Sequence, residues 1–332
     1  MIVTEESAKI KISKEKKISK KLPVFYNPVM KLNRDVSILL LNSVSNKDMQ
    51  IALPLAGSGI RGIRFLQELK KGKIKSVSMN DYKTSKNIKE NLKLNKLTLK
   101  NIFVYSKDAN LFLLESKGFD YIDIDPFGTP NPFLESAIVR LARNGILAVT
   151  ATDTSALAGS SPTACQRKYW SKPLKNHFMH ETGIRILIRK VQLIGAQFEK
   201  ALTPIFSFYA DHYYKVFFRC DKGRKKADEI IKQHSVMKYE NKEYGPIWIG
   251  KLWDEKLVEK MYKNHNKNNK KLSDLISIIK DECKINTVGF YDLHKLSKQK
   301  KIAIPKIELI LKKDMSRTHF LGWGIRSKKA PI

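Results

Sequence analysis

The stretch Asp123–Pro130, with the sequence DIDPFGTP, combines residue types that could act on the exocyclic amine of a nucleobase. Such an amine is a poor nucleophile because its lone pair is delocalised into the ring. Asp125 could accept the amine hydrogens, localise that lone pair as a methyl group arrives, and take or relay the proton. Pro126 fixes the backbone and has no N–H, and Phe127 offers a flat face on which a base can stack. The same residues also fit an ordinary type I turn, with Pro at its second position and Gly at its fourth.

A glycine-rich loop lies upstream in the sequence LAGSGIRGIRF, where Gly57, Gly59 and Gly62 follow the spacing GxGxxG. Glycines permit a tight turn and a close approach of the backbone, and the helix N-terminus beyond them favours negative charge. Gly57 and Gly59 are therefore candidates to bind a nucleotide cofactor. Dehydrogenases and methyltransferases both place such a loop after the first strand, so the motif fits NAD as well as S-adenosylmethionine.

Two carboxylates follow the loop at predicted strand ends. Asp81 lies 22 residues after Gly59, where a carboxylate can accept both hydroxyls of a ribose. Asp108 lies just past the next strand. In methyltransferase sheets an acid at that position faces the adenine amine of S-adenosylmethionine, which dehydrogenases seldom need, so Asp108 favours the methyltransferase. Either acid could instead cap a helix N-terminus.

Alternating strands and helices must position these side chains. The predicted strands are Ile51–Leu55, Ile74–Met79, Ile102–Tyr105, Tyr121–Ile124, Ile146–Ala151, Ala201–Tyr209 and His212–Arg219. The predicted helices are Arg61–Lys70, Thr84–Leu94, Leu111–Ser116, Pro132–Ala142 and Glu181–Ile194. This alternation indicates βαβ units and a mostly parallel sheet, and the last two strands indicate an antiparallel hairpin at one edge. The pattern predicts a seven-stranded doubly wound α/β sheet with a ligand crevice at the carboxyl ends of its strands.

The chain has 332 residues, of which 42% are hydrophobic, enough for a sizeable core and two domains. The alternation stops after Cys220, so we predict one domain over residues 1–220 and a second over 221–332. The net charge of +31, from 63 basic and 32 acidic residues, predicts a polyanionic partner, first of all nucleic acid. A lysine-rich proteome is the alternative explanation. Both parts are basic, so charge alone does not say which one binds the polyanion.

The cysteines indicate a reducing compartment. Cys165, Cys220 and Cys283 are far apart and never form CxxC, so neither a disulfide framework nor a zinc site is predicted. No apolar run approaches the roughly 20 residues of a membrane span. The N-terminus lacks the apolar stretch of a signal peptide. We predict a cytoplasmic protein without a bound metal or a membrane partner.

Several stretches together resemble a known family, the tRNA guanine-N2 dimethyltransferases, which methylate the exocyclic amine of a guanine, usually at tRNA position 26. The matching stretches are PVFYNPVMKLNRD, AGSGIRGIRF, DIDPFGTP, GILAVTATDTSALAG, CQRKY, DHYYKVFFR, YGPIWIG and RTHFLGWGIRSKKAP. The resemblance implies a class I S-adenosylmethionine-dependent methyltransferase domain with a Rossmann-like sheet. It also implies a smaller α+β C-terminal domain that is specific to the family, which we expect to bind tRNA. Family members often carry a four-cysteine zinc site, which this chain lacks.

Residue by residue, the resemblance implies a cofactor site around the glycine loop. Arg34 and Arg61 would lie beside the cofactor, with Arg34 the better candidate for its methionine carboxylate. Asp81 would hold the ribose, and Asp108 with Ala109 the adenine. For the two arginines, core packing or a surface ion pair is the alternative.

The resemblance also implies a substrate site. Asp125 would be the catalytic acceptor, with Phe25 and Phe127 bracketing a flipped guanine. Arg167 and Lys168 lie in a polar, basic segment after the fifth strand. RNA should enter at that rim of the crevice, so these two side chains are candidates for phosphate contact, with a merely solvated rim as the alternative.

The expected activity is methyl transfer from S-adenosylmethionine to the N2 amine of guanine 26 in tRNA, giving N2-methylguanosine and then N2,N2-dimethylguanosine. Two alternatives stay open: an N6-adenine methyltransferase on RNA or DNA, and a non-catalytic RNA-binding protein on a methyltransferase fold. An NAD dehydrogenase is disfavoured because no acid–base pair for hydride transfer is evident. We predict no obligate protein partner.

Overall fold

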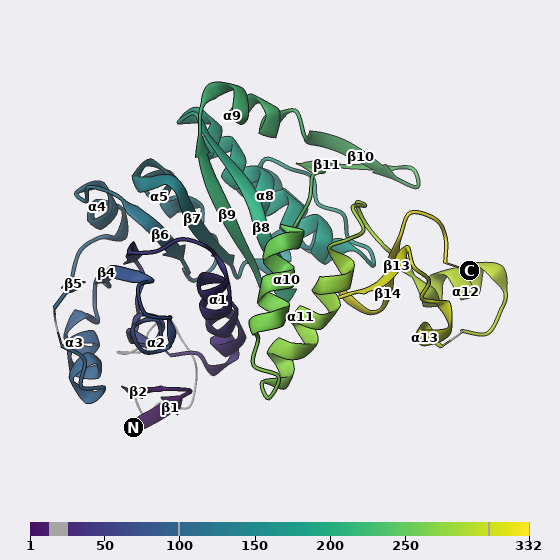
Figure 1. Ribbon diagram of the computed structural model, residues 1–332. Helices are drawn as coiled ribbons and strands as arrows, with labels where there is room; N and C mark the ends of the chain where they lie inside the picture. Colours follow the sequence, from purple (N-terminus) through teal and green to yellow (C-terminus); the bar gives the residue numbers. More distant parts are fainter. Residues whose placement is uncertain (13–25, 99, 305, 332) are drawn as a thin grey trace.

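The computed structural model describes residues 1–12, 26–98, 100–304 and 306–331 (Figure 1). At its centre lies a seven-stranded sheet in the order β5-β4-β3-β6-β7-β9-β8. The strands are β3 (Met49–Leu53), β4 (Ile74–Asn80), β5 (Ile102–Tyr105), β6 (Phe119–Ile124), β7 (Leu141–Ala151), β8 (Lys200–Ala210) and β9 (Tyr213–Lys222). β3 to β7 are parallel, whereas β9 is antiparallel to both β7 and β8. The predicted Rossmann-like sheet is confirmed, with the second strand of the closing hairpin inside the sheet and the first at its edge.

Helices cover both faces of this sheet (Figure 1). One face carries α1 (Lys31–Ser43), α2 (Ile60–Glu68) and α3 (Ser85–Leu94), and the other carries α4 (Ala109–Leu114), α5 (Asn131–Arg140) and α8 (Met179–Gln197). Two short helices, α6 (Thr154–Leu157) and α7 (Pro162–Tyr169), follow β7. Because both faces are covered, the central strands are apolar without alternation.

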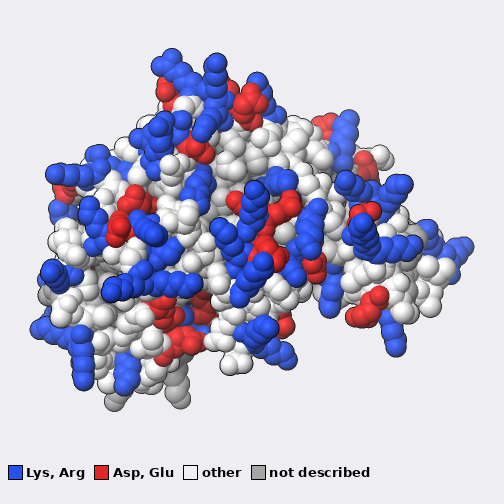
Figure 2. All heavy atoms as spheres, in the orientation of Figure 1, with Lys and Arg blue, Asp and Glu red and all other residues white. Residues whose placement is uncertain are grey.

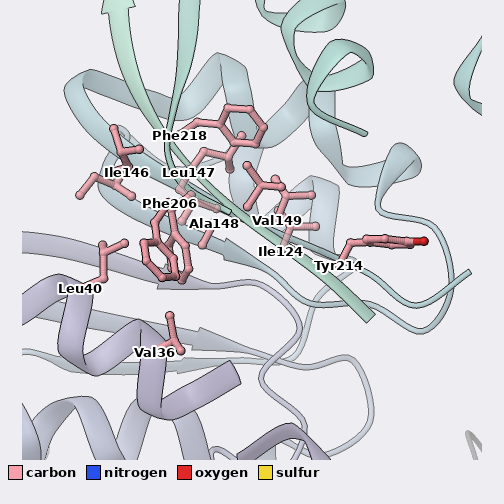
Figure 3. Close-up of a cluster of buried hydrophobic side chains, with 14 of the residues drawn as sticks. Val36, Leu40, Ile124, Ile146, Leu147, Ala148, Val149, Phe206, Tyr214 and Phe218 are labelled. Carbon is pink, nitrogen blue, oxygen red and sulfur yellow. The ribbon is translucent and has the colours of Figure 1, made fainter. Parts of the chain in front are cut away.

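The core between α1 and the sheet illustrates this covering. Residues 146–149 of β7 form an apolar run that is fully buried. Figure 3 shows Val36 and Leu40 of α1 pointing toward the ring of Phe206 of β8. All three side chains are completely buried, so α1 is packed firmly against the sheet.

A short N-terminal hairpin, β1 (Ile2–Glu5) and β2 (Ala8–Lys11), lies against α2 and α3. Side chains of α3 and of its C-cap satisfy the free edge of β2: the N–H of Lys11 donates to Oδ1 of Asn91 at 2.7 Å, and the N–H of Lys9 to Oδ1 of Asn95 at 2.8 Å. We did not predict this hairpin from the sequence, because its lysines made the segment look merely basic and its strands are only four residues long.

The C-terminal part continues from the sheet. Its elements are α9 (Arg224–Ile231), β10 (His234–Tyr239), β11 (Lys242–Trp248), α10 (Glu255–Asn264), α11 (Lys270–Glu282), β12 (Tyr291–Asp292), α12 (Leu293–Lys300), α13 (Ile307–Ile310), β13 (Met315–Thr318) and β14 (Leu321–Ser327). α10 and α11 pack against α1, and one hydrophobic core runs from the sheet into both helices. Within the described residues, no helix is both long and apolar enough to cross a membrane.

A buried group of charges ties the C-terminal part to the sheet. We call Glu181, Arg185, Glu282, His319 and Arg326 the domain-interface cluster. Nη2 of Arg326, on β14, lies 2.7 Å from Oε2 of Glu181 on α8 and 2.9 Å from Oε1 of Glu282 on α11. Arg185 binds Glu181 at 2.8 Å, and Nδ1 of His319 lies 2.7 Å from Oε2 of Glu282. The side chains of all five are at most 2% exposed, so the cluster is sealed from solvent.

Candidate active site

A cavity of about 900 Å³ opens at the carboxyl ends of β3, β4 and β6. It lies beside the point where the strand order reverses, between β3 and β6. Its walls come from the N-terminal part of α1, the loop before α2, the end of β4, the turn after β6 and the start of β9. Doubly wound sheets bind their ligands at such a switch point.

The glycine loop forms the floor of this cavity. Gly57 and Gly59 have φ values of 55° and 81°, in the left-handed region that glycine adopts without strain, and Gly59 is the N-cap of α2. Gly62 has a different use, because a Cβ there would lie 2.3 Å from Sδ of Met79 on β4. The loop therefore combines a bare turn with close packing of α2 on the sheet, as expected for a nucleotide cradle.

Asp81 connects the end of β4 to this loop and lines the cavity. Its Oδ2 accepts the N–H of Gly57 at 3.0 Å. Its Oδ1 accepts the N–H groups of Lys83 and Thr84, each at 3.0 Å. Asp81 thus closes its own turn and holds the glycine loop in place. Among the described residues Oδ2 accepts only one hydrogen bond and keeps a second lone pair, so a sugar hydroxyl could still donate to it.

Asp125 lies at the mouth of the cavity, one residue beyond β6. Its side chain is one-fifth exposed, and its Oδ2 accepts a hydrogen bond from Nη2 of Arg61 at 2.5 Å. Arg61 also binds Asp123 at 3.2 Å through Nη1. Burial alone would lower the pKa of Arg61, but the two carboxylates outweigh burial and raise it. A permanent cation therefore lies behind the carboxylate predicted to be catalytic.

Arg34 lines the same cavity, and its guanidinium forms an ion pair with Glu5. Nε and Nη2 of Arg34 bind the two carboxylate oxygens of Glu5 at 2.7 and 2.5 Å. Burial alone would raise the pKa of Glu5, but Arg34 and Arg64 lower it below its ordinary value. Glu5 is therefore a carboxylate that fixes Arg34 in the cavity wall. The role of Arg34 toward a cofactor carboxylate stays a prediction.

The aromatic residues predicted to hold a base differ in what can be said of them. Phe127 is 44% exposed and lines the cavity, whereas Phe25 lies outside the described residues. Its neighbour Tyr26 lines the cavity and donates its hydroxyl to Oε2 of Glu5 at 2.9 Å. Burial and the adjacent Glu5 raise the pKa of Tyr26 to about 12. Two aromatic side chains therefore line the cavity from different segments: Tyr26 from the segment before α1, and Phe127 from the turn after β6.

Asp108 makes the contacts of a helix cap. Its Oδ1 accepts the N–H groups of Asn110 and Leu111 at 2.9 and 3.2 Å, at the start of α4. Among the described residues, those that line the cavity include neither Asp108 nor Ala109. Their proposed contact with adenine stays a prediction.

Arg167 and Lys168 lie in the last turn of α7 and are exposed. Nζ of Lys168 lies 3.3 Å from Oδ2 of Asp153. Neither residue is among the described residues that line the cavity, but the backbone carbonyl of Lys168 accepts a hydrogen bond from Nδ2 of Asn131, at the start of α5, at 2.7 Å. Their contact with RNA phosphate also stays a prediction.

Two cavity-lining hydroxyls were not predicted from the sequence. Ser58 and Tyr213 are each 1% exposed. The Oγ of Ser58 and the hydroxyl of Tyr213 have no hydrogen-bond partner among the described residues. A buried polar group without a partner costs about 1–3 kcal/mol, so both are suited to a ligand that fills the cavity. The glycine motif could have pointed to Ser58, but nothing in the local sequence singled out Tyr213.

The donor set of the cavity fits a nucleoside cofactor with a charged tail. It combines a glycine cradle, a strand-end carboxylate, two unpaired hydroxyls and an arginine. Within the described residues, no group of three or more His, Cys, Asp and Glu side chains could hold a metal ion. An acceptor carboxylate and an exposed phenyl ring at the mouth complete a site for group transfer to a planar amine.

Comparison with known proteins gives a consistent result. The family model described as N2,N2-dimethylguanosine tRNA methyltransferase matches residues 6–241 and 234–331. The chain is 40% identical to a tRNA (guanine(26)-N(2)/guanine(27)-N(2))-dimethyltransferase of Aquifex aeolicus, over 98% of this chain and 92% of that protein. It is 38% identical to a tRNA (guanine(26)-N(2))-dimethyltransferase of Methanocaldococcus jannaschii, over 98% and 95% respectively.

A solved structure is similar over the whole chain. It is Trm1 from Pyrococcus horikoshii in complex with S-adenosyl-L-methionine, with a TM-score of 0.88 and 33% sequence identity. The similarity covers 100% of this chain and 97% of that one. Both the sheet and the C-terminal part therefore have a counterpart of known structure.

Proposed function

The chain belongs to the N2,N2-dimethylguanosine tRNA methyltransferase family, and we propose that it transfers methyl groups from S-adenosylmethionine to the N2 amine of guanine 26 in tRNA. The products are N2-methylguanosine and then N2,N2-dimethylguanosine. The observation that carries the proposal is the position of Asp125, at the mouth of a cavity whose floor is the glycine loop. Methyl donor and acceptor amine could meet at that carboxylate.

We assign the cofactor to the inner part of the cavity. S-adenosylmethionine, when bound, supplies an electrophilic methyl group. Gly57 and Gly59 would allow the backbone to approach it, Asp81 would accept from its ribose, and Arg34, which lines the cavity, would bind its methionine carboxylate. Asp108 and Ala109 are placed one strand further along, where they would meet the adenine.

We assign the guanine to the outer part. A base that is stacked and paired cannot react, so the target must be flipped out of the tRNA. Phe127 supports its face, with Phe25 as the proposed second ring. Asp125 accepts a hydrogen from the N2 amine and so localises the nitrogen lone pair. The N–CH₃ bond would form as the S–CH₃ bond of the bound donor breaks and S-adenosylhomocysteine is left, and Asp125 would receive the proton of the broken N–H bond or pass it to water.

The surface of the molecule suits a polyanion. Figure 2 shows Lys and Arg side chains spread over both the methyltransferase part and the C-terminal part, with acidic side chains interspersed. Arg167 and Lys168 extend this basic surface beside the cavity. With about six phosphate contacts, affinity for tRNA should fall about a thousandfold between 50 and 200 mM salt. A flat salt response would contradict the electrostatic part of the proposal.

The test is to incubate the protein with S-adenosylmethionine and unmodified tRNA transcripts, and to identify the nucleosides of the digest by mass spectrometry. Asp125→Ala is assayed alongside. N2,N2-dimethylguanosine made only by the parent protein supports the proposal. Methylated adenine would overturn the substrate, and cofactor binding without any methylation would favour a binding protein.

A second pair of transcripts resolves the position. One carries guanine at position 26 and adenine at 27, and the other has the two bases exchanged. Product from the first alone supports guanine 26. Product from both would extend the activity to position 27, as in the name of the Aquifex aeolicus relative.

We further propose a cytoplasmic location and activity without an obligate protein partner. Methylation of tRNA by the purified chain alone tests the second point, and fractionation of cells tests the first.

A further inference from the structure

We propose that Lys215, acting through Asp123 and Arg61, is a positioning residue for the carboxylate that ends β6. That carboxylate belongs to Asp125, so the inference rests on the function proposed above. We call these four residues the active-site charge chain. The chain runs from the middle of the sheet to the mouth of the cavity.

The geometry of the chain is continuous. Nζ of Lys215, on β9, donates to Oδ1 of Asp123 on β6 at 2.7 Å. Oδ2 of Asp123 lies 3.2 Å from Nη1 of Arg61 on α2, and Nη2 of Arg61 donates to Oδ2 of Asp125. The side chains of Lys215 and Asp123 are completely buried, that of Arg61 is 9% exposed, and that of Asp125 is 20% exposed. Exposure therefore rises along the chain toward the cavity.

The chain is electrically neutral only as a whole. It contains two cations and two carboxylates, and Arg61 faces both carboxylates. Without a second cation, Asp123 and Asp125 would share one positive charge inside the protein. Lys215 supplies that second charge, although its side chain is completely buried and is not among the described residues that line the cavity. Desolvation by burial lowers the pKa of Lys215, an effect that the adjacent carboxylates oppose.

Neutral side chains close the chain into a fixed frame. Lys215 also donates to Oγ1 of Thr150 at 3.1 Å, and Asn33 links Thr150 to Arg61 at 3.3 and 2.9 Å. The hydroxyl of Tyr121 donates to Oδ2 of Asp123 at 2.6 Å. Arg61 is thus held at several points, so its direction toward the β6 turn is set by the sheet.

Other charged groups lie around Tyr213, which lines the same cavity at the start of β9. Arg34 lies on the α1 wall of the cavity. Burial raises the pKa of Tyr213, and Asp211, in the turn between β8 and β9, and Asp125 raise it further. These groups are unchanged when Lys215 is replaced, so a change in pH dependence would report on the chain itself.

The test is Lys215→Met in the full-length protein. Loss of the deep cation leaves Asp123 to draw Arg61 away from Asp125. We expect kcat on tRNA to fall about 10–100-fold, as for a small misplacement of a reacting group. We also expect the pH–rate profile to change, because the substitution removes one of the two positive charges of the chain. The Kd for S-adenosylhomocysteine, measured by calorimetry, should change less than about threefold, since Lys215 itself is not among the described residues that line the cavity.

The double variant Asp123→Asn/Lys215→Met restores electrical neutrality, because Arg61 and Asp125 remain as the only charged pair of the chain. Each new side chain is similar in size to the one it replaces. If charge balance matters, the double variant regains most of the lost kcat and the parent pH profile. If Lys215 only fills space, the losses of the two substitutions add and the pH profile does not return.

The matched control is Lys200→Met. Lys200 is also a buried lysine of the same sheet, but its Nζ binds the backbone carbonyls of Ile138, Val139 and Leu141 and no carboxylate of the described residues. It should lose stability without a shift in the pH–rate profile. The inference is overturned if Lys215→Met behaves like Lys200→Met, or if the double variant is no better than the single one. Failure of the parent protein to methylate tRNA would instead overturn the proposed function.

Discussion

The protein buries two sets of charged side chains that form the same kinds of ion pair but differ in whether any member reaches solvent. The domain-interface cluster is enclosed, and each of its carboxylates is held by arginine, histidine or backbone donors. The active-site charge chain is enclosed at Lys215 and open at Asp125. Buried ion pairs are weak evidence for stability as such, since apolar side chains can often replace them. The two sets therefore differ in one respect: the active-site charge chain ends at a partly exposed carboxylate, through which we propose that it acts, whereas the domain-interface cluster only joins parts of the fold.

The open end predicts the largest effect. In Asp125→Asn the side chain keeps its shape but loses its charge and most of its capacity to accept the amine hydrogens. We expect kcat to fall about 10²–10⁴-fold, with S-adenosylhomocysteine still bound. Nucleoside mass spectrometry and calorimetry measure the two quantities. Retained activity would mean that this end of the chain is structural as well, and the contrast with the domain-interface cluster would disappear.

The closed cluster predicts a loss of stability rather than of chemistry. Arg326→Met leaves Glu181 and Glu282 short of a buried cation, which should lower the free energy of unfolding by about 3–5 kcal/mol. Urea unfolding at pH 7 measures this loss. The kcat of the folded fraction, assayed at low temperature, should stay within about twofold of the parent, because within the described part of the chain no hydrogen bond or ion pair joins the cluster directly to a cavity-lining residue. A loss of kcat without a loss of stability would contradict the division between the two sets.

Acid should lower the free energy of unfolding through the domain-interface cluster, which is the next largest effect. Burial alone would raise the pKa of Glu282, but His319 and Arg326 outweigh burial and lower it from 4.5 to about 2. As pH falls, the unfolded chain takes up this proton first, so the contribution is complete above about pH 4.5 and is lost between pH 4.5 and 2. It amounts to about 3 kcal/mol.

Unfolding measured across this pH range for the parent and for Glu282→Gln checks the acid prediction. The gap between the two proteins should close toward pH 2. Glu240→Gln removes an exposed carboxylate whose pKa is also lowered, here by Lys295. It is the matched control and should leave the stability profile unchanged. An equal gap at pH 7 and pH 2 would count against the assignment.

Tyr213→Phe gives the smallest effect and separates stability from function. The substitution removes a buried hydroxyl that has no partner among the described residues, so the free energy of unfolding should stay equal or rise by about 1 kcal/mol. If a ligand atom is the missing partner, kcat/KM should fall about fivefold to tenfold. Ser207→Ala removes another buried, unpaired hydroxyl, one that does not line this cavity, and should affect stability alone. Equal kinetics for Tyr213→Phe and the parent would remove Tyr213 from the ligand site.

Much of the sheet could be predicted because its signals are local. Apolar runs end in Gly57, Asp81 and Asp125, and each of these residues lines the cavity. Strand-end polar residues meet at one edge of a parallel sheet, so their proximity follows from topology alone. The helix at Lys31–Ser43 also has a local signal, since Pro28 lies in the turn just before it.

The active-site charge chain could not be predicted, because its contacts are distant in sequence. Lys215 and Asp123 are 92 residues apart, and within the aromatic strand YYKVFFR a lysine gives no sign of which partner it meets. The ion pair between Arg34 and Glu5, 29 residues earlier, could not be predicted for the same reason. Asp108 presents a different difficulty. Its residue type and position fit both a helix cap and a contact with adenine, and the hydrogen bonds of the structure are those of the helix cap.

Arg326 also sets an order of events during synthesis. It lies 145 residues after Glu181 and 44 after Glu282. A ribosome that adds about 5–20 residues per second needs about 7–30 s to cover the longer interval. During that time the sheet can assemble, with Arg185 as the interim partner of Glu181, but the C-terminal part cannot lock onto it. The nascent methyltransferase part must therefore tolerate an unfinished interface until β14 arrives.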